Sequence, residues 1–484
     1  MDRREFLRVS GAVGASAAVG SVLSSCSPVP GTVGLGREYF PSTLPEGSIL
    51  SVPANEAPID HVVILMMENR SFDHYLGWLA SDEGYLDRGR RNYGASFSID
   101  GQQAQTYRSP DGTEFETYSM AGGTSVAGFR GCGFGDPAHG WSAGRAQRDL
   151  GFLGEGSGND MFALGYQEAD DLPFHSRMAR RFTTFDRYHA SVLGPTQPNR
   201  RYLHSAQSGG YKNNYLPIAE LGHQWDTIWD RLRAAGVGVR SYSPDLPSLA
   251  FWGERMAPIL WPIDRYFADC AGGTLPAVTF LDPPHWESGL FVLTYDEWGG
   301  FFDHVAPPVL PDLLGSPVDS ENFGQAGFRV PTVLASPFAQ PGFVDHRTYD
   351  HTSILRFLEW RFLGAPPEGP GGTADWSLTP RDRNAANIGA SLGLTGPDPQ
   401  VFDLDDLPLR APSHPCTGAG QLVAPGMQPD RAARVAAGMA AAGTPDLTVG
   451  GPGGDMLEAL EAGYFEQVGV DPEPSSMAGT WAAP

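Results

Sequence analysis

Three short stretches of the chain are rich in side chains that bind metal ions and phosphate. Residues 68–74 are Glu-Asn-Arg-Ser-Phe-Asp-His, and residues 194–200 are Gly-Pro-Thr-Gln-Pro-Asn-Arg. Residues 296–304 begin with Asp-Glu-Trp-Gly-Gly and end with Asp-His. Carboxylate and amide oxygens are typical ligands of hard divalent cations, and arginine suits phosphate. We therefore expect the three stretches to form one active site.

Two of these stretches follow runs that are typical of buried strands. Residues 61–67 form a nearly continuous apolar run, as expected for a strand buried on both faces of a parallel sheet. Residues 290–295 are β-rich and stop at an acidic pair. Ligands of open α/β sheets collect outside the carboxyl ends of the strands. The two strands should thus deliver oxygen ligands to one edge.

A metal-assisted nucleophile is the chemistry that this combination favours. Glu68, Asn69, Asp296 and Glu297 provide three carboxylates and an amide oxygen as expected metal ligands. A threonine beside a divalent cation can lose its proton and attack phosphorus, because the cation stabilises the alkoxide. Thr196 is expected in a turn between Pro195 and Pro198, and Arg200 could clamp a phosphate. One divalent ion is implied, with Ca²⁺, Mg²⁺, Mn²⁺, Zn²⁺ and Fe all left open.

Histidines are needed to protonate the leaving oxygen and to stabilise phosphoryl oxygens. The candidates are His139, His189, His304, His346 and His351, and the sequence alone does not rank them. Each site residue also has a structural explanation when taken alone. Thr196 by itself is more often a turn residue, and Glu68 could cap a helix. The joint occurrence of all these groups is what favours a catalytic site.

Composition excludes several classes of function. The net charge is −23 and the pI is about 4.8, so no basic stripe is available to bind nucleic acid. Lys212 is the only lysine, which excludes a P-loop and disfavours a Schiff-base mechanism. No Cys-x-Pro-x-Arg sequence occurs, which disfavours a sulfatase.

The N-terminus has the features of an export signal. Arg3 and Arg4 precede a mildly apolar stretch at 9–23, which matches a twin-arginine signal for the corresponding export machinery. Leu-Ser-Ser-Cys then ends at Cys26 and resembles a lipobox, so Cys26 is a candidate for lipidation. An ordinary signal peptide with an incidental cysteine is the alternative. Both interpretations predict an exported protein, either secreted or held in the cell envelope.

The remaining chain divides by composition. We expect a signal at 1–26, a linker at 27–57, a catalytic domain at 58–400 and a Gly/Pro/Ala-rich extension at 401–484. Residues 84–160 show little periodicity and predict a long irregular insertion. Predicted helices are 174–181, 224–234, 352–361 with Thr352 or Ser353 near its N-cap, and 455–468. Predicted strands are 61–67, 182–188, 238–241, 277–281, 290–295 and 330–335.

Together these stretches resemble the bacterial phosphocholine-preferring phospholipases C and the related acid phosphatases, which belong to the alkaline-phosphatase-like superfamily. The similarity spans about residues 58–362. It implies an α/β fold, with a mostly parallel central sheet flanked by helices and long loop insertions. It also implies that Thr196 forms a phosphoenzyme within the metal site, and that His139 and His304 contact the phosphoryl group. A phospholipid at a membrane surface would be the substrate.

One departure from the family concerns the crossover near 282–289. The family carries several dozen residues between the two strands, here 277–281 and 290–295, where this chain has eight. Eight residues cannot hold the usual crossover helix. Either these strands are not parallel neighbours or a crossover has been lost. The expected function is therefore an exported phospholipase C, with two alternatives: an acid phosphatase, or a catalytically impaired lipoprotein that binds phosphorylated ligands.

Overall fold

A computed structural model describes residues 47–120, 136–215, 217, 222–243, 247–280, 288–371 and 376–394. All of these residues belong to one compact unit of the chain, 35–484. Several predictions lie outside the described residues. They concern the signal at 1–26 with Cys26, most of the linker, the connection at 281–287, and the extension with its helix at 455–468.

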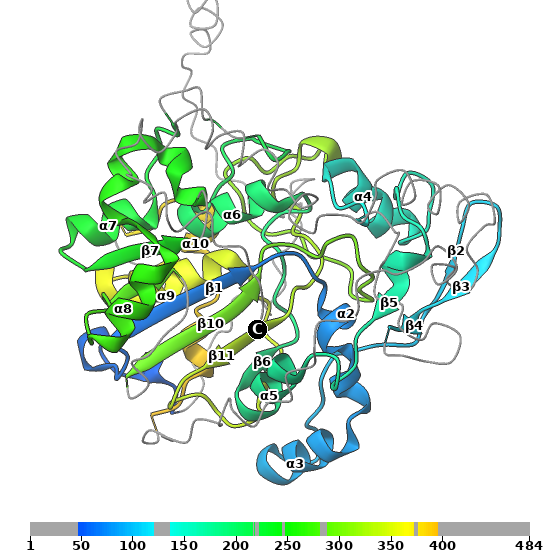
Figure 1. The fold of residues 1–484 in the computed structure, drawn as a ribbon, viewed down its shortest axis with the longest axis horizontal. Helices are drawn as coiled ribbons and strands as arrows, with labels where there is room; N and C mark the ends of the chain where they lie inside the picture. Colours follow the sequence, from blue (N-terminus) through cyan, green and yellow to red (C-terminus); the bar gives the residue numbers. More distant parts are fainter. Residues whose placement is uncertain are drawn as a thin grey trace, which may run out of the picture. The chain divides into compact units, whose positions relative to one another are not determined.

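The central element is an eight-stranded sheet with the order β12-β6-β11-β10-β1-β9-β7-β8 (Figure 1). In that order the strands are Val344–Asp345, Thr183–Phe185, Thr332–Ala335, Gly289–Tyr295, His61–Met67, Val278–Phe280, Val239–Ser243 and Leu260–Pro262. Strand β11 is antiparallel to β10 and β6, and the other pairings are parallel. The predicted α/β class with a mostly parallel sheet flanked by helices is confirmed.

Helices cover both faces of this sheet. The α-helices are α2 Phe72–Leu76, α3 Glu83–Tyr93, α4 Trp141–Leu150, α5 Pro173–Arg181, α6 Thr196–Ser205, α7 Ile228–Ala234, α8 Ile263–Ala271, α9 His351–Leu363 and α10 Pro380–Arg383. Helix α9 packs on α6, α7 and α10, whereas α5 contacts β11 and α8 contacts β7 and β8. Figure 1 shows α5 and α8 in front of the sheet and α9 behind it.

Shorter elements complete the described chain. The 3-10 helices are η1 Ile49–Ser51, η2 Ala54–Glu56, η3 Gly77–Ser81, η4 Met161–Leu164, η5 Ser248–Ile259, η6 Asp319–Glu321 and η7 Ile388–Ser391. Two small sheets pair β2 Thr106–Arg108 with β3 Glu114–Glu116, and β4 Tyr118–Ser119 with β5 Gly165–Tyr166. Ile49 and Leu50 are buried in the main core, so the packed body already includes residues upstream of Ile59.

Strands β1 and β10 lie at the centre of the sheet because their sequences suit burial on both faces. Every residue of β10 is buried, and so are Val62, Val63 and Ile64 of β1. These residues belong to the same hydrophobic core as Leu355 and Phe357 of α9. A strand that is apolar on both faces gains most when helices cover both sides.

The short connection after β9 joins strands that are not neighbours. Strand β1 lies between β9 and β10, and it pairs in parallel with both. Val278 of β9 and Leu290 of β10 both pair with Val62 of β1. Phe280, the last residue of β9, therefore lies only three residues further along the strand direction than Gly289, the first residue of β10. At about 3.3 Å per residue and 4.8 Å per strand, these ends lie roughly 14 Å apart. Eight residues can span that distance without a helix.

The prediction of an irregular insertion at 84–160 is wrong. This region contains most of α3 and all of α4. Asp82 caps α3 by accepting a hydrogen bond from the backbone N–H of Tyr85. Gly84 and Gly89 lower the helix propensity and obscured the pattern, yet a Cβ at Gly89 would lie 2.0 Å from the Phe97 ring. Close packing therefore requires glycine inside this helix.

Two helix starts also differ from the prediction. Helix α7 begins after Thr227, which forms a capping box with Asp230, rather than at position 224. Helix α9 is capped by Asp350, whose side chain accepts from the Thr352 N–H, while the Ser353 side chain bonds back to the Asp350 N–H. In both cases the side chain that satisfies the free N–H groups of the first turn decides where the helix begins.

Candidate active site

The carboxyl ends of β1 and β10 place acidic groups side by side. Met67 pairs with Tyr295 at the end of the ladder, and the N–H of Asp296 donates to the Met67 carbonyl at 3.0 Å. Glu68 and Asp296 therefore leave neighbouring strands at the same level. This arrangement is the one expected from the two apolar runs that precede them.

Thr196 occupies the first position of α6, not the predicted turn. Pro195 is the N-cap, and Pro198 falls in the first turn, where a missing N–H costs nothing. The Thr196 hydroxyl donates to Glu68 Oε1 at 2.9 Å. The positive end of a helix favours negative charge at this position. An alkoxide or a bound phosphate would be stabilised here.

Arg200 lies one turn further along α6 and joins both strand ends. Its Nε donates to Asp296 Oδ2 at 2.9 Å, and its Nη2 donates to Glu68 Oε2 at 3.1 Å. Asp296 is fully buried, and the Arg200 side chain is 20% exposed. Hydrogen bonds between ionised partners are stronger and shorter than neutral ones. One arginine thus orders the carboxylates on either side of the β1–β10 junction.

The two acids after β10 are held in surroundings that disfavour their ionisation. Burial raises the pKa of Asp296 to about 7, although Arg200 opposes the shift. Burial likewise raises the pKa of Glu297 to about 8, against the effect of His139. Glu297 Oε2 accepts from the Gly299 N–H at 2.6 Å, whereas its Oε1 is buried without a hydrogen-bond partner. Such an oxygen is suited to a cation.

The predicted ligand set fits a hard divalent cation by its chemistry. Three carboxylates and an amide oxygen are oxygen donors of the kind that Ca²⁺, Mg²⁺ and Mn²⁺ prefer. Asn69 Oδ1 accepts from Arg70 Nη1 at 2.5 Å, so the amide oxygen is already oriented. Glu297 Oε1 accepts no hydrogen bond, and the positive group near it in the structure is His139, whose Nε2 lies 3.6 Å away.

Two glycines keep the loop after β10 close to the site. Gly299 and Gly300 have φ values of 65° and 72°, in the left-handed region that favours glycine. A Cβ on Gly299 would lie 2.3 Å from the Asn69 carbonyl oxygen, and one on Gly300 would lie 2.5 Å from the Ala138 carbonyl oxygen. The glycines therefore allow this loop to pack against the segments that carry Asn69 and His139.

His139 contacts the acidic edge. Its Nε2 lies 3.6 Å from Glu297 Oε1, and its Nδ1 lies 2.8 Å from the Pro137 carbonyl oxygen, to which it can donate. Burial would lower the pKa of His139, but the nearby carboxylates of Glu297 and Asp136 outweigh it and raise the pKa. A histidine in these surroundings favours the protonated form and can act as a proton donor.

His304 lies in a second network of buried charges. Its Nδ1 and Nε2 lie 2.5 Å from Asp73 Oδ2 and 3.0 Å from Asp100 Oδ1. Burial lowers its pKa, but the hydrogen bonds to Asp100 and Asp73 prevail and raise it to about 9. Arg329 is fully buried, 3.1 Å from Asp73 and 2.9 Å from Asp303. A contact of His304 with phosphate stays a prediction.

This second network is a possible cation site by composition. Ligand atoms of Asp73, Asp303 and His304 lie within 4.8 Å of one another. Arg329 supplies a positive charge to both carboxylates, as Arg200 does to Glu68 and Asp296 at the strand ends. Arg329 and Asp100 also belong to this network, and neither was among the predicted site residues. The motif 68–74 pointed to Asp73, but no local pattern identifies its distant partners.

The three other candidate histidines have separate surroundings. His189 is buried and its Nδ1 lies 3.0 Å from the Gly327 carbonyl oxygen. His351 Nε2 lies 2.8 Å from the backbone carbonyl of Asp296, and burial lowers its pKa to about 4. The half-exposed His346 is 2.8 Å from Asp186. Of the five candidates, His139 has the side-chain contact with the acids at the strand ends.

Two Gly-x-Ser-x-Gly pentapeptides, residues 140–144 and 389–393, do not form a serine-hydrolase site. A nucleophile elbow requires serine on a sharp turn between a strand and a helix. Ser142 is exposed within α4, and the strand before it in the described chain, β4, does not belong to the central sheet. Ser391 is buried in η7 and donates to Asp345 at 2.5 Å.

The described part of the chain contains no helix with the length and apolar character of a membrane span.

Comparison with known proteins agrees with this geometry. The non-hemolytic phospholipase C of Pseudomonas aeruginosa is 29% identical over 421 residues, which cover 69% of this chain and 58% of the relative. The Burkholderia pseudomallei protein of the same name is 26% identical, covering 75% and 61%. Phospholipase C B of Mycobacterium tuberculosis is 28% identical, covering 74% and 82%. The chain thus spans about three fifths of the length of the first two relatives.

The match to a family model covers the whole site. It includes residues 59–285 and 279–363, which carry β1, α6, β10 and α9 with all the predicted ligands. This is more than half of the chain, and it supports the prediction of a phosphoric ester hydrolase. The chain belongs to the phosphoesterase family.

Proposed function

We propose that the protein is a metal-dependent phospholipase C, which cleaves phosphatidylcholine-like lipids into diacylglycerol and a phosphorylated headgroup. The observation that carries the proposal is the 2.9 Å hydrogen bond from the Thr196 hydroxyl to Glu68, at the N-terminus of α6 and beside Asp296. The relatives named as phospholipases C support the choice of substrate class.

The first step would transfer the phosphoryl group to the protein. The Thr196 oxygen attacks phosphorus while Glu68 Oε1 accepts the hydroxyl proton. A new bond forms between Thr196 Oγ1 and phosphorus, and the bond between phosphorus and the glycerol oxygen breaks. The phosphorylated headgroup is then held on Thr196, and diacylglycerol is released once its oxygen gains a proton.

His139 is the proposed donor of that proton. Its contact with Glu297 and its raised pKa favour the protonated form. In the second step, a water molecule attacks the phosphothreonine and gives its proton back to His139, while Thr196 recovers the proton held by Glu68. Arg200 keeps Glu68 and Asp296 in position during both steps. The two steps together consume one water molecule and restore the protein.

A divalent ion would be held by Glu68, Asn69, Asp296, Glu297 and Thr196. When bound, it would stabilise the Thr196 oxygen and offset charge that develops on the phosphoryl oxygens. The buried Glu297 Oε1, which has no hydrogen-bond partner, supports this assignment. Residues 58–400 would form the catalytic domain, with 401–484 as an extension. Export through the twin-arginine route and lipidation of Cys26 belong to the same proposal.

Two chromogenic esters test the proposed function. The purified protein would be assayed on p-nitrophenyl phosphorylcholine and on p-nitrophenyl phosphate, with and without a chelator. We expect cleavage of the diester that is lost with the chelator and in Thr196→Val. Cleavage of the monoester alone would favour an acid phosphatase. If a folded, metal-loaded protein cleaves neither ester, the phospholipase proposal is wrong and an impaired binding protein becomes the better explanation.

A further inference from the structure

Large apolar side chains are concentrated on one exposed loop. Of the ten such side chains that are exposed among the described residues, four lie within residues 309–318. They are Val309 at 38%, Leu313 at 55%, Leu314 at 40% and Val318 at 56% exposure. Single exposed apolar residues are common on soluble proteins, whereas a cluster indicates an interaction surface.

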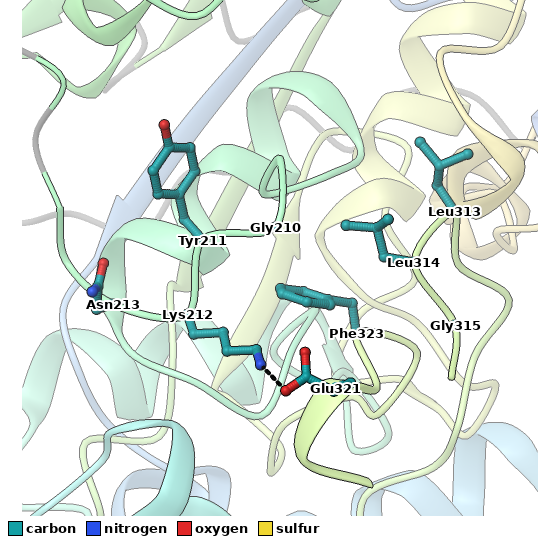
Figure 2. A pocket seen from close by; sticks show the side chains of 9 residues that line it. All are labelled: Gly210, Tyr211, Lys212, Asn213, Leu313, Leu314, Gly315, Glu321 and Phe323. Atoms are coloured by element: carbon teal, nitrogen blue, oxygen red, sulfur yellow. Dashed lines mark ion pairs between the residues drawn. The ribbon is translucent and has the colours of Figure 1, made fainter. Parts of the chain in front are cut away.

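The loop borders a pocket of about 670 Å³. Leu313 and Leu314 lie on one side of it, Tyr211 and Lys212 lie on the other, and Phe323 lies between them (Figure 2). The pocket therefore combines an apolar wall with a polar one, as a site for an amphipathic molecule should.

Both walls of this pocket are tied to the helix that begins at Thr196. The backbone N–H of Gln197 donates to Asn214 Oδ1 at 2.9 Å, next to the wall that carries Lys212. On the other side, the Tyr202 hydroxyl donates to Asp312 Oδ2 at 2.6 Å, directly before Leu313. Helix α6 thus connects the proposed nucleophile to both walls.

The floor of the pocket also packs against the segment that carries the proposed proton donor, His139. The ring of Phe323 packs on Trp141, with 4.7 Å between centroids, and Trp141 follows His139 by two positions. The base of the loop is fixed, because Leu310 and Gly324 share a backbone hydrogen bond and Arg145 donates to the carbonyls of Asp319 and Asn322. Because the base of the loop is held in place, its exposed apolar side chains can enter a lipid surface without unfolding the loop.

The negative charge around the loop determines which kind of lipid surface it can bind. The Lys212 ammonium pairs with Glu321 at 2.6 Å, so the only lysine of the chain is neutralised within the pocket. Asp319 and Glu321 are about half exposed beside the loop, and the chain as a whole carries a charge of −23. An anionic lipid surface would repel such a region, whereas a zwitterionic one would not.

We propose that the loop 309–318 inserts into a zwitterionic phospholipid surface and that the adjoining pocket receives the acyl-glycerol part of one lipid. The inference rests on the proposed function, because it assigns the lipid-binding part of the same site. The exposed leucines would displace water at the interface, and the polar wall would face the glycerol and headgroup region. The lipid phosphate would then point towards the N-terminus of α6.

The test uses a variant of the full chain with Leu313→Asp and Leu314→Asp. The first readout is the ratio of the rate on phosphatidylcholine vesicles to the rate on soluble p-nitrophenyl phosphorylcholine. We expect this ratio to fall about tenfold or more, because two apolar side chains lose their transfer into lipid. The matched control is Phe267→Asp, a 61% exposed residue on α8, which should leave the ratio unchanged.

The second readout separates binding from catalysis. In the Thr196→Val background, flotation with phosphatidylcholine vesicles should be lost in the double Leu variant and should be weaker with phosphatidylglycerol vesicles. If the unmodified protein floats with the vesicles but cleaves no ester, the result supports loop 309–318 as a lipid-binding surface and rejects the proposed function. An unchanged rate ratio with unchanged flotation would overturn the inference, and so would binding to anionic vesicles only. Thermal melting of both variants checks that they are folded.

Discussion

The Thr196 hydroxyl lies 2.9 Å from Glu68 Oε1, although 128 positions separate the two residues in the chain. The bond joins the start of α6 to the end of β1, and Arg200 reinforces it by donating to the other oxygen of Glu68. The proposed nucleophile and its base are therefore ordered before any substrate binds. Such preorganisation removes an entropic cost from the chemical step.

Thr196 should be essential as an oxygen nucleophile. Thr196→Val keeps the shape of the side chain and should lower kcat on p-nitrophenyl phosphorylcholine by about a thousandfold or more. Thr196→Ser should retain measurable turnover, because the hydroxyl is kept. Mass spectrometry of acid-quenched reactions should detect a phosphorylated peptide in the unmodified protein and none in the valine variant. Full activity of Thr196→Val would exclude this residue as the nucleophile.

Metal binding should depend on the acids at the strand ends and not on the second charge network. Glu297→Gln should weaken the binding of a divalent cation by at least about a hundredfold, measured by titration calorimetry. Asp303→Asn is the matched control, since Arg329 already pairs with that carboxylate. The opposite result, with binding abolished only in Asp303→Asn, would move the metal site to the Asp73, Asp303 and His304 cluster.

Gly299 should tolerate no side chain. Gly299→Ala combines a positive φ of 65° with a Cβ that would lie 2.3 Å from the Asn69 carbonyl oxygen. We expect a loss of more than about 3 kcal/mol in the free energy of unfolding, together with loss of activity. Gly364→Ala is the control, because its φ is 78° but no atom lies within 4 Å of the added Cβ. That change should cost about 1 kcal/mol. If Gly299→Ala and Gly364→Ala lower the free energy of unfolding equally in urea denaturation, the close approach of Gly299 to Asn69 is not the cause of the loss.

The charged His304 should stabilise the protein at neutral pH and lose that effect in alkali. Its pKa is raised from 6.5 to about 9, so the folded protein binds the proton more tightly than the unfolded chain does. The stabilisation is complete below about pH 6.5 and disappears as the pH rises through 9. The difference in unfolding free energy between the unmodified protein and His304→Gln should therefore be about 1 to 2 kcal/mol larger at pH 6 than at pH 9.5, allowing for partial exposure. A difference that does not vary with pH would show that His304 is not held as a cation.

Local patterns predicted the residues that converge at the edge of the sheet. The apolar runs at 61–67 and 290–295 are too short for a typical helix, and they form strands of the sheet that helices cover on both faces. The meeting of Glu68 and Asp296 at the carboxyl ends followed from that assignment. The same approach failed for α3 and α6, because glycines and prolines within their sequences lower the apparent helix propensity.

The sequence by itself determined which groups stand at the ends of β1 and β10, since strand hydrophobicity and the residues that follow are local properties. Only the tertiary structure decided that Thr196 begins a helix and meets Glu68, that Arg200 joins two strands, and that His304 pairs with Asp73 and Asp100. These pairings depend on how distant segments pack and on which buried charges must be neutralised. No pattern along the chain encodes such contacts at a fixed spacing.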